Sequence, residues 1–205
     1  VAIKAEVDYP SKPADFLSLD EVPLIDTWRA MEKCVDEEMC RHIGVSNFSA
    51  QKVYNLKEES RIQPEMNQVE MHPFLQQAEL VAFCQDEGVH LTAYSPLGSS
   101  DRPARVMKDT DPNLLEKEVI KSIGIENNIS PAQVLLAWSV QRGVAAIPKS
   151  SNRDRLAQNI QSASIVLSQE AVEKIDQLDQ HYRLIAGNGW TIEGSPYTQA
   201  NLWDE

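Results

Sequence analysis

The hydrophobic positions of this chain alternate between a helical spacing and short apolar runs along most of its length. Apolar residues three and four positions apart predict a helix from Leu24 to about Cys40. The same spacing predicts helices over residues 49–60, 75–87, 114–127, 130–142, 152–162 and 168–179. Short apolar runs predict strands at 42–48, 66–71, 89–95 and 144–148. This alternation indicates an α/β protein with a parallel sheet and right-handed crossovers.

Some helix ends carry local signals of their own. The segment Ser130 to Gln133 combines a capping box with a proline at the first helical position, so a helix should begin there. Gly88 and Gly143 follow helical segments and should end them.

The two ends of the chain lie outside this pattern. Residues 1–23 hold prolines and mixed charge, and residues 183–205 hold glycines and aromatics. We expect both to be loops of a single domain spanning 1–205. The chain opens on Val1 rather than methionine, so we expect a processed or cut N-terminus.

Composition narrows the class of protein. The net charge of -12 opposes binding to nucleic acid, whose phosphates need a basic surface. No apolar run reaches the roughly 20 residues of a membrane span and no signal peptide is visible, so we expect a cytoplasmic protein without a membrane partner. The three cysteines form no C-x-x-C pair, and the four histidines have no metal-binding spacing. Both observations favour reduced thiols and no metal site.

Polar side chains gather where the predicted strands end. They are Ser46-Asn47, Gln68, Tyr94-Ser95 and Lys149-Ser150. Ligands of parallel sheets and of TIM barrels bind at this carboxyl edge. Neither a G-x-G-x-x-G nor a P-loop sequence follows a strand, so a Rossmann site is not expected.

The number of strands is informative in its own right. A (β/α)8 barrel needs eight strands and about 250 residues, whereas the pattern here predicts half as many strands. Parallel strands with apolar faces would leave two open edges. We therefore expect the sheet to pair with further residues of the same protein or with a second copy.

Several motifs in register resemble the aldo-keto reductase superfamily, in particular its aldehyde- and aldose-reductase-like members. They are Ile43–Phe48, Asn67–Pro73, Tyr94–Ser99, Ile147–Ser150 with Arg155 and Asn159, and the tail segments Gly194–Tyr197 and Asn201–Asp204. The resemblance covers nearly all of the chain from Leu24. It implies the C-terminal part, about four βα units, of a TIM barrel that binds extended NADPH across its C-terminal face.

The resemblance assigns one group of residues to the nicotinamide end of NADPH. It implies that Ser46, Asn47 and Gln68 hold the carboxamide, which needs partners that both donate and accept. It also implies that Tyr94 stacks on the nicotinamide ring. Without the resemblance, Ser46 and Asn47 would read as caps of the following helix, and Tyr94 as a core residue.

Two further groups match the rest of the cofactor. The loop over the pyrophosphate is matched by Ser95, Leu97 and Ser99, with Asp101 as a latch to a basic partner. The pocket for the 2′-phosphate is matched by Lys149, Ser150, Asn152 and Arg155. The resemblance implies that Gln158 and Asn159 face the adenine. The family often has glutamate where Gln158 stands. The basic cluster of Lys149, Arg153 and Arg155 in an acidic chain favours NADP over NAD.

The residues that carry the family's chemistry are not visible in the chain. The family uses a tyrosine, a lysine, an aspartate and a histidine from earlier strands, and we expect these upstream of Val1. The tyrosines present, Tyr9, Tyr54, Tyr94, Tyr182 and Tyr197, do not stand in the catalytic context. His72 precedes a proline in a later motif, and we interpret it as a packing and turn residue.

The leading hypothesis is therefore a portion of a monomeric NADPH-dependent reductase of small aldehyde or aldose carbonyls, inactive as this chain alone. A noncatalytic NADP-binding regulatory subunit and a pair of associating half barrels are the alternatives. Trp28, Met31 and Leu135 should pack against the rest of a barrel. Three tail residues, Trp190, Ile192 and Trp203, either line the substrate pocket or pack the tail, and the sequence does not decide between these roles.

Overall fold

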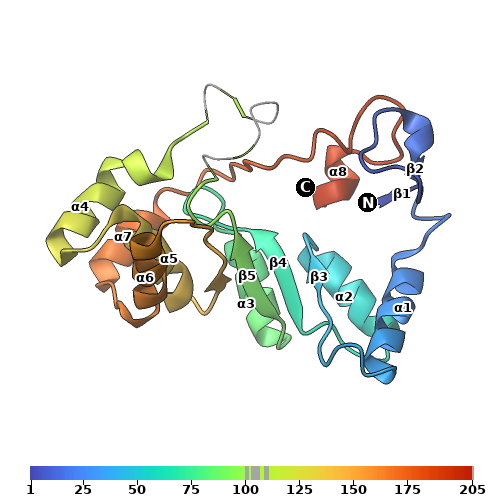
Figure 1. Ribbon diagram of the computed structural model, residues 1–205, viewed down its shortest axis with the longest axis horizontal. Helices are drawn as coiled ribbons and strands as arrows, with labels where there is room; N and C mark the ends of the chain where they lie inside the picture. Colours follow the sequence, from blue (N-terminus) through green and yellow to red (C-terminus); the bar gives the residue numbers. More distant parts are fainter. Residues whose placement is uncertain (100–101, 103–106, 109–110, 205) are drawn as a thin grey trace. The chain divides into compact units, whose positions relative to one another are not determined.

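The computed structural model describes residues 1–99, 102, 107–108 and 111–204 (Figure 1). The chain divides into two compact units. Unit 1 comprises Val1–Asn67 and Ala186–Glu205, and unit 2 comprises Gln68–Ile185. The two units are described separately below.

The strands form the expected α/β arrangement. A four-stranded sheet has the order β3 (Val45–Ser46), β4 (Met66–Glu70), β5 (His90–Tyr94) and β6 (Ala145–Ala146). Strands β5 and β6 are parallel, with Thr92 opposite Ala145 and Ala93 opposite Ala146. The parallel sheet predicted from the hydrophobic pattern is therefore confirmed.

Strands β3 and β6 are shorter than the sequence pattern predicted. Asn47 has a φ of 59°, in the left-handed region, so the extended backbone of β3 ends immediately before it. Ile147 still donates its N–H to the carbonyl of Ala93 at 3.1 Å, but the next residue, Pro148, has no N–H to continue the ladder.

The described part of unit 1 contains the α-helices α1 (Leu24–Asp36), α2 (Ala50–Glu59) and α8 (Gln199–Trp203). The indole of Trp28 packs with Ile43 and Leu56 in a buried cluster, and its Nε1 donates to the carbonyl of Ile62 at 2.8 Å. Helix α1 ends before the predicted boundary at Cys40, because Glu38 has a φ of 58°.

Both ends of the chain, expected to be irregular, contain some regular structure. β1 (Ala2–Ile3) pairs antiparallel with β2 (Phe16–Leu17), and a 3₁₀ turn covers Pro13–Asp15. In the tail, Thr198 and Asn201 form a capping box at the start of α8. The remainder of the tail is irregular, as expected.

Among its described residues, unit 2 contains five α-helices besides short 3₁₀ turns at Leu114–Glu116 and Ser162–Ser164. They are α3 (Ala78–Asp86), α4 (Glu118–Asn127), α5 (Pro131–Gln141), α6 (Arg153–Gln161) and α7 (Gln169–Asp176). The capping box at Ser130 is present, with its hydroxyl accepting from the Gln133 N–H at 3.3 Å. Helix α3 starts three residues later than predicted, because Gln77 is left-handed with a φ of 48°.

The core of unit 2 corrects one expectation. Leu135 is fully buried with Phe74, Trp138 and other apolar side chains of α4, α5 and α7. Trp28 of unit 1 is only 3% exposed, so neither residue needs a further part of a barrel to cover it. Met31 is the exception, with 36% of its surface exposed.

Over the described residues, no helix combines the length and hydropathy that crossing a bilayer requires.

Candidate functional site

Unit 2 contains a cavity of about 320 Å³ that brings together residues from three separate segments. Seven residues assigned from the family resemblance line it, namely Ser95, Leu97, Ser99, Lys149, Ser150, Asn152 and Arg155. A neighbouring cavity of about 290 Å³ shares Leu97, Lys149, Ser150 and Arg155 with the first. Gln158 and Asn159 line this second cavity. The residues predicted to bind the 2′-phosphate and those predicted to face the adenine therefore lie around two cavities that share part of their lining.

The start of α6 explains how the polar residues of the first cavity are held. Asn152 is the N-cap, and its Oδ1 accepts from the backbone N–H groups of Asp154 and Arg155, each at 3.0 Å. Ser150 Oγ in turn accepts from the N–H of Asn152 at 3.1 Å. The N-terminus of a helix favours a negative charge, and the cationic side chains of Lys149 and Arg155 line the same cavity. This arrangement suits an anionic group.

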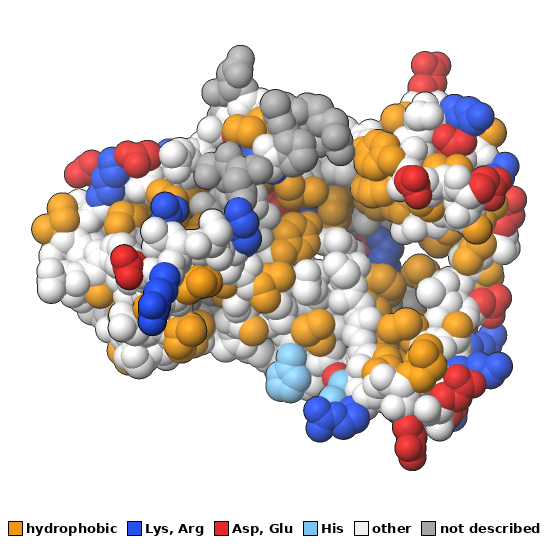
Figure 2. Space-filling model, viewed as in Figure 1, with side chains coloured by type: hydrophobic (Ala, Val, Ile, Leu, Met, Phe, Trp, Pro, Cys, Tyr) orange, Lys and Arg blue, Asp and Glu red, His pale blue; other side chains and the backbone are white. Residues whose placement is uncertain are grey.

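The surface over α6 agrees with this interpretation. Lys and Arg side chains are visible over α6 on the face of the molecule shown in Figure 2. The second cavity adds Lys121, which forms an ion pair with Glu116. The hydrogen bond that Lys121 donates to Glu116 raises the pKa of Lys121, so this lysine stays cationic. Leu115, Glu116 and Lys121 were missed by the sequence reasoning, since no motif marks them.

The loop after β5 has a strained backbone. Ser95 and Ser99 have φ values of 53° and 43°, in the left-handed region that residues other than glycine rarely adopt. The hydroxyl of Ser99 donates to that of Ser95 at 2.6 Å. Gly98, with a φ of 89°, closes the turn by donating its N–H to the Ser95 carbonyl at 2.9 Å. Asp101, the predicted latch, lies outside the described residues.

A buried arginine holds this loop and gave no sequence signal. Arg102 donates through Nη1 to the carbonyls of Gly98 and Ser99, at 3.2 and 3.1 Å. Its Nη2 pairs with the carboxylate of Asp111. The side chain of Arg102 is 5% exposed, so the loop backbone rests on an almost fully buried ion pair.

Gln68 and Tyr94, assigned to the nicotinamide, are not among the residues that line the two cavities of unit 2. Tyr94 is the last residue of β5, and Gln68 lies within β4. Burial raises the pKa of the Tyr94 hydroxyl, and the charge of Glu70 raises it further, while Arg183 opposes both. Tyr94 therefore stays neutral at physiological pH, which suits an aromatic platform rather than an acid.

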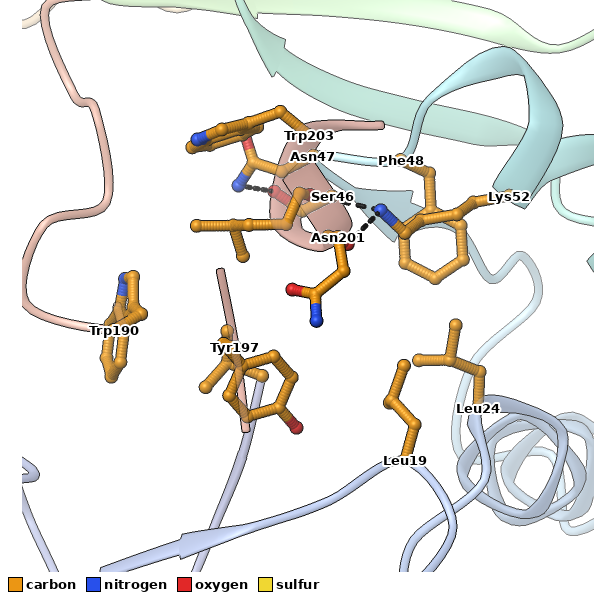
Figure 3. Close-up of a pocket in the computed structure, with 12 residues that line it drawn as sticks. Leu19, Leu24, Ser46, Asn47, Phe48, Lys52, Trp190, Tyr197, Asn201 and Trp203 are labelled. Atoms are coloured by element: carbon orange, nitrogen blue, oxygen red, sulfur yellow. Dashed lines mark hydrogen bonds between the residues drawn. The ribbon is translucent and has the colours of Figure 1, made fainter. Parts of the chain in front are cut away.

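Unit 1 has its own cavity of about 290 Å³, which contains Ser46 and Asn47 (Figure 3). Asn47 Nδ2 donates to Ser46 Oγ at 3.1 Å. Its Oδ1 is buried and accepts no hydrogen bond from the described residues. Ser49, and not Ser46 or Asn47, caps α2, because its Oγ accepts from the Lys52 N–H at 3.1 Å. The Oδ1 of Asn47 is therefore a buried acceptor that none of the described residues satisfies.

The tail supplies the opposite wall of the same cavity. Trp190, Tyr197, Leu202 and Trp203 line it, and Ile192 is not among its lining residues. The indole Nε1 of Trp203 also donates to the carbonyl of Ala186 at 3.1 Å. Trp203 thus lines this cavity and also packs the tail, while its role in a substrate pocket stays a prediction.

His72 lies in the interior of unit 2. It is fully buried, and its Nε2 is 2.9 Å from Glu70 Oε1. Its backbone pairs with that of Leu75 in an isolated bridge. These contacts agree with the interpretation of His72 as a packing and turn residue.

Comparisons with known proteins agree with the motifs. The model of the aldo/keto reductase family matches residues 7–180. The chain is 49% identical over 205 residues to aldo/keto reductase slr0942 of Synechocystis, covering all of this chain and 63% of that protein. It is 44% identical over 179 residues to the NADPH-dependent D-xylose reductase of Meyerozyma guilliermondii, covering 85% of this chain and 55% of that protein.

A mammalian relative gives the same picture. The aldo-keto reductase family 1 member A1 of Sus scrofa is 41% identical over 177 residues, which are 86% of this chain and 54% of that protein. The chain thus spans between about half and two-thirds of the length of these relatives. Because the family model matches most of its residues, and because a named aldo/keto reductase is similar to it over its full length, the chain belongs to the aldo/keto reductase family.

Proposed function

We propose that this chain is the cofactor-binding portion of an NADPH-dependent reductase that converts aldehyde and aldose carbonyls to alcohols. Its sheet would be part of a (β/α)8 barrel whose remaining strands come from outside the chain. The observation that carries the proposal is the cavity of unit 2, where Lys149, Arg155 and four serines surround one space. Relatives named as D-xylose reductases support the substrate class.

The preference for NADPH rests on charge. A 2′-phosphate is dianionic, and a lysine with a forked arginine is well suited to bind it. Lys149 and Arg155 line the same cavity in a chain with a net charge of -12, so this is a local positive site in an acidic protein. Relatives named as NADPH-dependent and as NADH-dependent both occur, so the proposed preference for NADPH rests on these two residues and not on the relatives.

A bound NADPH would supply the hydride that the carbonyl carbon accepts. The chain's own contribution there is orientation. In unit 1, Asn47 Oδ1 would accept from the carboxamide NH2, and Ser46 would add a further hydrogen bond. In unit 2, Gln68 and Tyr94 keep the assignments that the resemblance gives them, an amide partner for the carboxamide and a flat apolar face for the ring. The proton for the alcohol oxygen is not assigned to any residue of this chain.

The test is a titration of the complete protein with NADPH and NADH, followed by fluorescence. Arg155→Ala should weaken NADPH binding by about 10- to 100-fold, the loss expected for a charged hydrogen bond, and leave NADH binding unchanged. Arg153→Ala is the matched control, because this exposed arginine lies on the same helix but does not line either cavity.

Equal weakening of NADPH and NADH by Arg155→Ala would contradict the phosphate assignment. Turnover distinguishes the proposal from the alternative role as a regulatory subunit. A complete protein that binds NADPH tightly but oxidises none of it in the presence of aldehydes would favour the noncatalytic role.

A further inference from the structure

The tail of the chain folds within unit 1 as one wall of the cavity that contains Ser46 and Asn47. Tyr197 donates its hydroxyl to the Leu17 carbonyl at 2.9 Å, and Trp203 donates to the Ala186 carbonyl at 3.1 Å. The tail ends in α8, a helix of five residues that contains no buried residue. A helix this short is unstable in isolation, so its position depends on contacts with the rest of the unit.

Lys52, in the first turn of α2, makes the most extensive of these contacts. Its Nζ donates to the carbonyls of Asn201 and Leu202 at 2.9 and 3.0 Å (Figure 3), and it is 2.9 Å from the carboxylate of Asp204. A lysine ammonium has three N–H donors, and all three have an acceptor at the end of α8. The Lys52 side chain is only 17% exposed, and it also lines the cavity.

The negative charge that pairs with Lys52 is the carboxylate of Asp204, the residue that follows α8. The Asp204 carboxylate pairs with Lys52 and accepts a hydrogen bond from the hydroxyl of Ser49, the N-cap of α2. A carboxylate at the N-terminus of α2 and an ammonium at the C-terminus of α8 each lie where the helix dipole favours them. Residues about 150 positions apart in sequence are thereby joined at two points.

From these contacts we propose that Lys52 is a positioning residue that fixes the tail wall of the cavity and thereby sets which carbonyl substrates fit. The inference rests on the proposed function, because the cavity becomes a substrate space only if Ser46 and Asn47 hold the nicotinamide end. The wall that Lys52 fixes is largely apolar, with Trp190, Tyr197 and Leu202 in it. Substrates with a large apolar group reach this wall and gain from its order, whereas small polar substrates do not reach it.

The experiment compares Lys52→Met, which keeps most of the side-chain volume but removes the charge, with Asp204→Asn, which removes only the ion pair. Hydrogen exchange of the unliganded complete protein should show the amides of α8 exchanging at least about tenfold faster in Lys52→Met, with a smaller change in Asp204→Asn. For naphthaldehyde, KM should rise about five- to tenfold in Lys52→Met, while kcat stays unchanged. For glyceraldehyde, both constants should stay at the wild-type values.

Lys33→Met is the control, because Lys33 is an exposed lysine of α1. It should change neither exchange nor selectivity. Unchanged hydrogen exchange of α8 in Lys52→Met would show that Lys52 does not hold the tail. Faster exchange with equal changes in KM for both aldehydes would show that Lys52 does not set substrate selectivity. A wild-type protein that reduces neither aldehyde would overturn the proposed function and the substrate role together, whereas the exchange result would still decide whether Lys52 holds the tail.

Discussion

Tyr182 donates its phenolic hydrogen to the carboxylate of Asp111 at 2.5 Å, and so joins two segments of unit 2 that are 71 residues apart in sequence. The same carboxylate accepts from the backbone N–H of Lys108 at 2.7 Å and pairs with Arg102. Because Arg102 also donates to the backbone of the loop after β5, Asp111 connects that loop to the segment that carries Tyr182. The proposed pyrophosphate loop is therefore held through its backbone by Arg102, which Asp111 in turn holds.

Asp111→Asn should destabilise unit 2 strongly. The substitution keeps the shape but leaves the Arg102 guanidinium, which is 5% exposed, without its opposite charge. Loss of one partner of a buried ion pair costs about 3 kcal/mol or more. Urea unfolding should show this loss, and Tyr182→Phe should show a smaller loss of about 2 kcal/mol, because it removes a single hydrogen bond to a charged group. Equal effects of the two substitutions would show that the ion pair contributes no more than the hydroxyl.

The same carboxylate should make stability depend on pH in the acid range. Burial by itself would raise the pKa of Asp111, but the Lys108 amide, the Tyr182 hydroxyl and the Arg102 charge together lower it below its ordinary value of 3.8. A lowered pKa in the folded state stabilises the protein at pH values above 3.8, and this contribution is lost as the pH falls through the folded-state pKa. The free energy of unfolding should fall below pH 4 by less in Asp111→Asn than in wild type, measured in urea.

Glu70 should prove essential to the start of the tail. This fully buried carboxylate accepts from the backbone N–H groups of Leu184 and Ile185 at 2.6 and 2.9 Å, and it contacts His72. Glu70→Gln replaces one acceptor oxygen by an NH2 group that faces donors, which should cost about 2 kcal/mol or more. Hydrogen exchange at Leu184 and Ile185 should accelerate. Wild-type exchange rates at these two amides would show that other contacts hold the segment.

The parts of the fold that were predictable from sequence are those encoded by neighbouring residues. The helix start at Ser130 depends on a partner three positions away, and the helix ends at Gly88 and Gly143 depend on the φ values of 70° and 77° that glycine allows. The capping box at Thr198 was missed because its third position holds Asn201, which does the work that glutamate or glutamine usually does.

The parts that were not predictable depend on partners without a sequence signature. Lys52 binds backbone carbonyls, which every residue has, and Arg102 likewise holds the backbone of a loop. Motifs in register pointed to Lys149 and Arg155, which do line one cavity, but the motifs could not show that Asn152 uses its oxygen to cap α6. Hydrogen bonds from a side chain to the backbone of a distant segment are visible only in the structure.

Asn47 gives a prediction that separates the two ends of the proposed cofactor site. NADPH and NADH share the carboxamide and differ only in the 2′-phosphate, so loss of a carboxamide contact should weaken both equally. Glycine adopts the φ of 59° at this position without strain, which makes Asn47→Gly a substitution that removes the side chain but spares the backbone. Binding of NADPH and of NADH should each weaken about tenfold, the effect of one hydrogen bond, measured by fluorescence titration.

Arg155→Ala provides the contrast, because it should affect NADPH alone. A selective loss of NADPH binding in Asn47→Gly would place Asn47 near the phosphate, and unchanged binding of both cofactors would remove it from the site, since its buried Oδ1 would then serve no ligand.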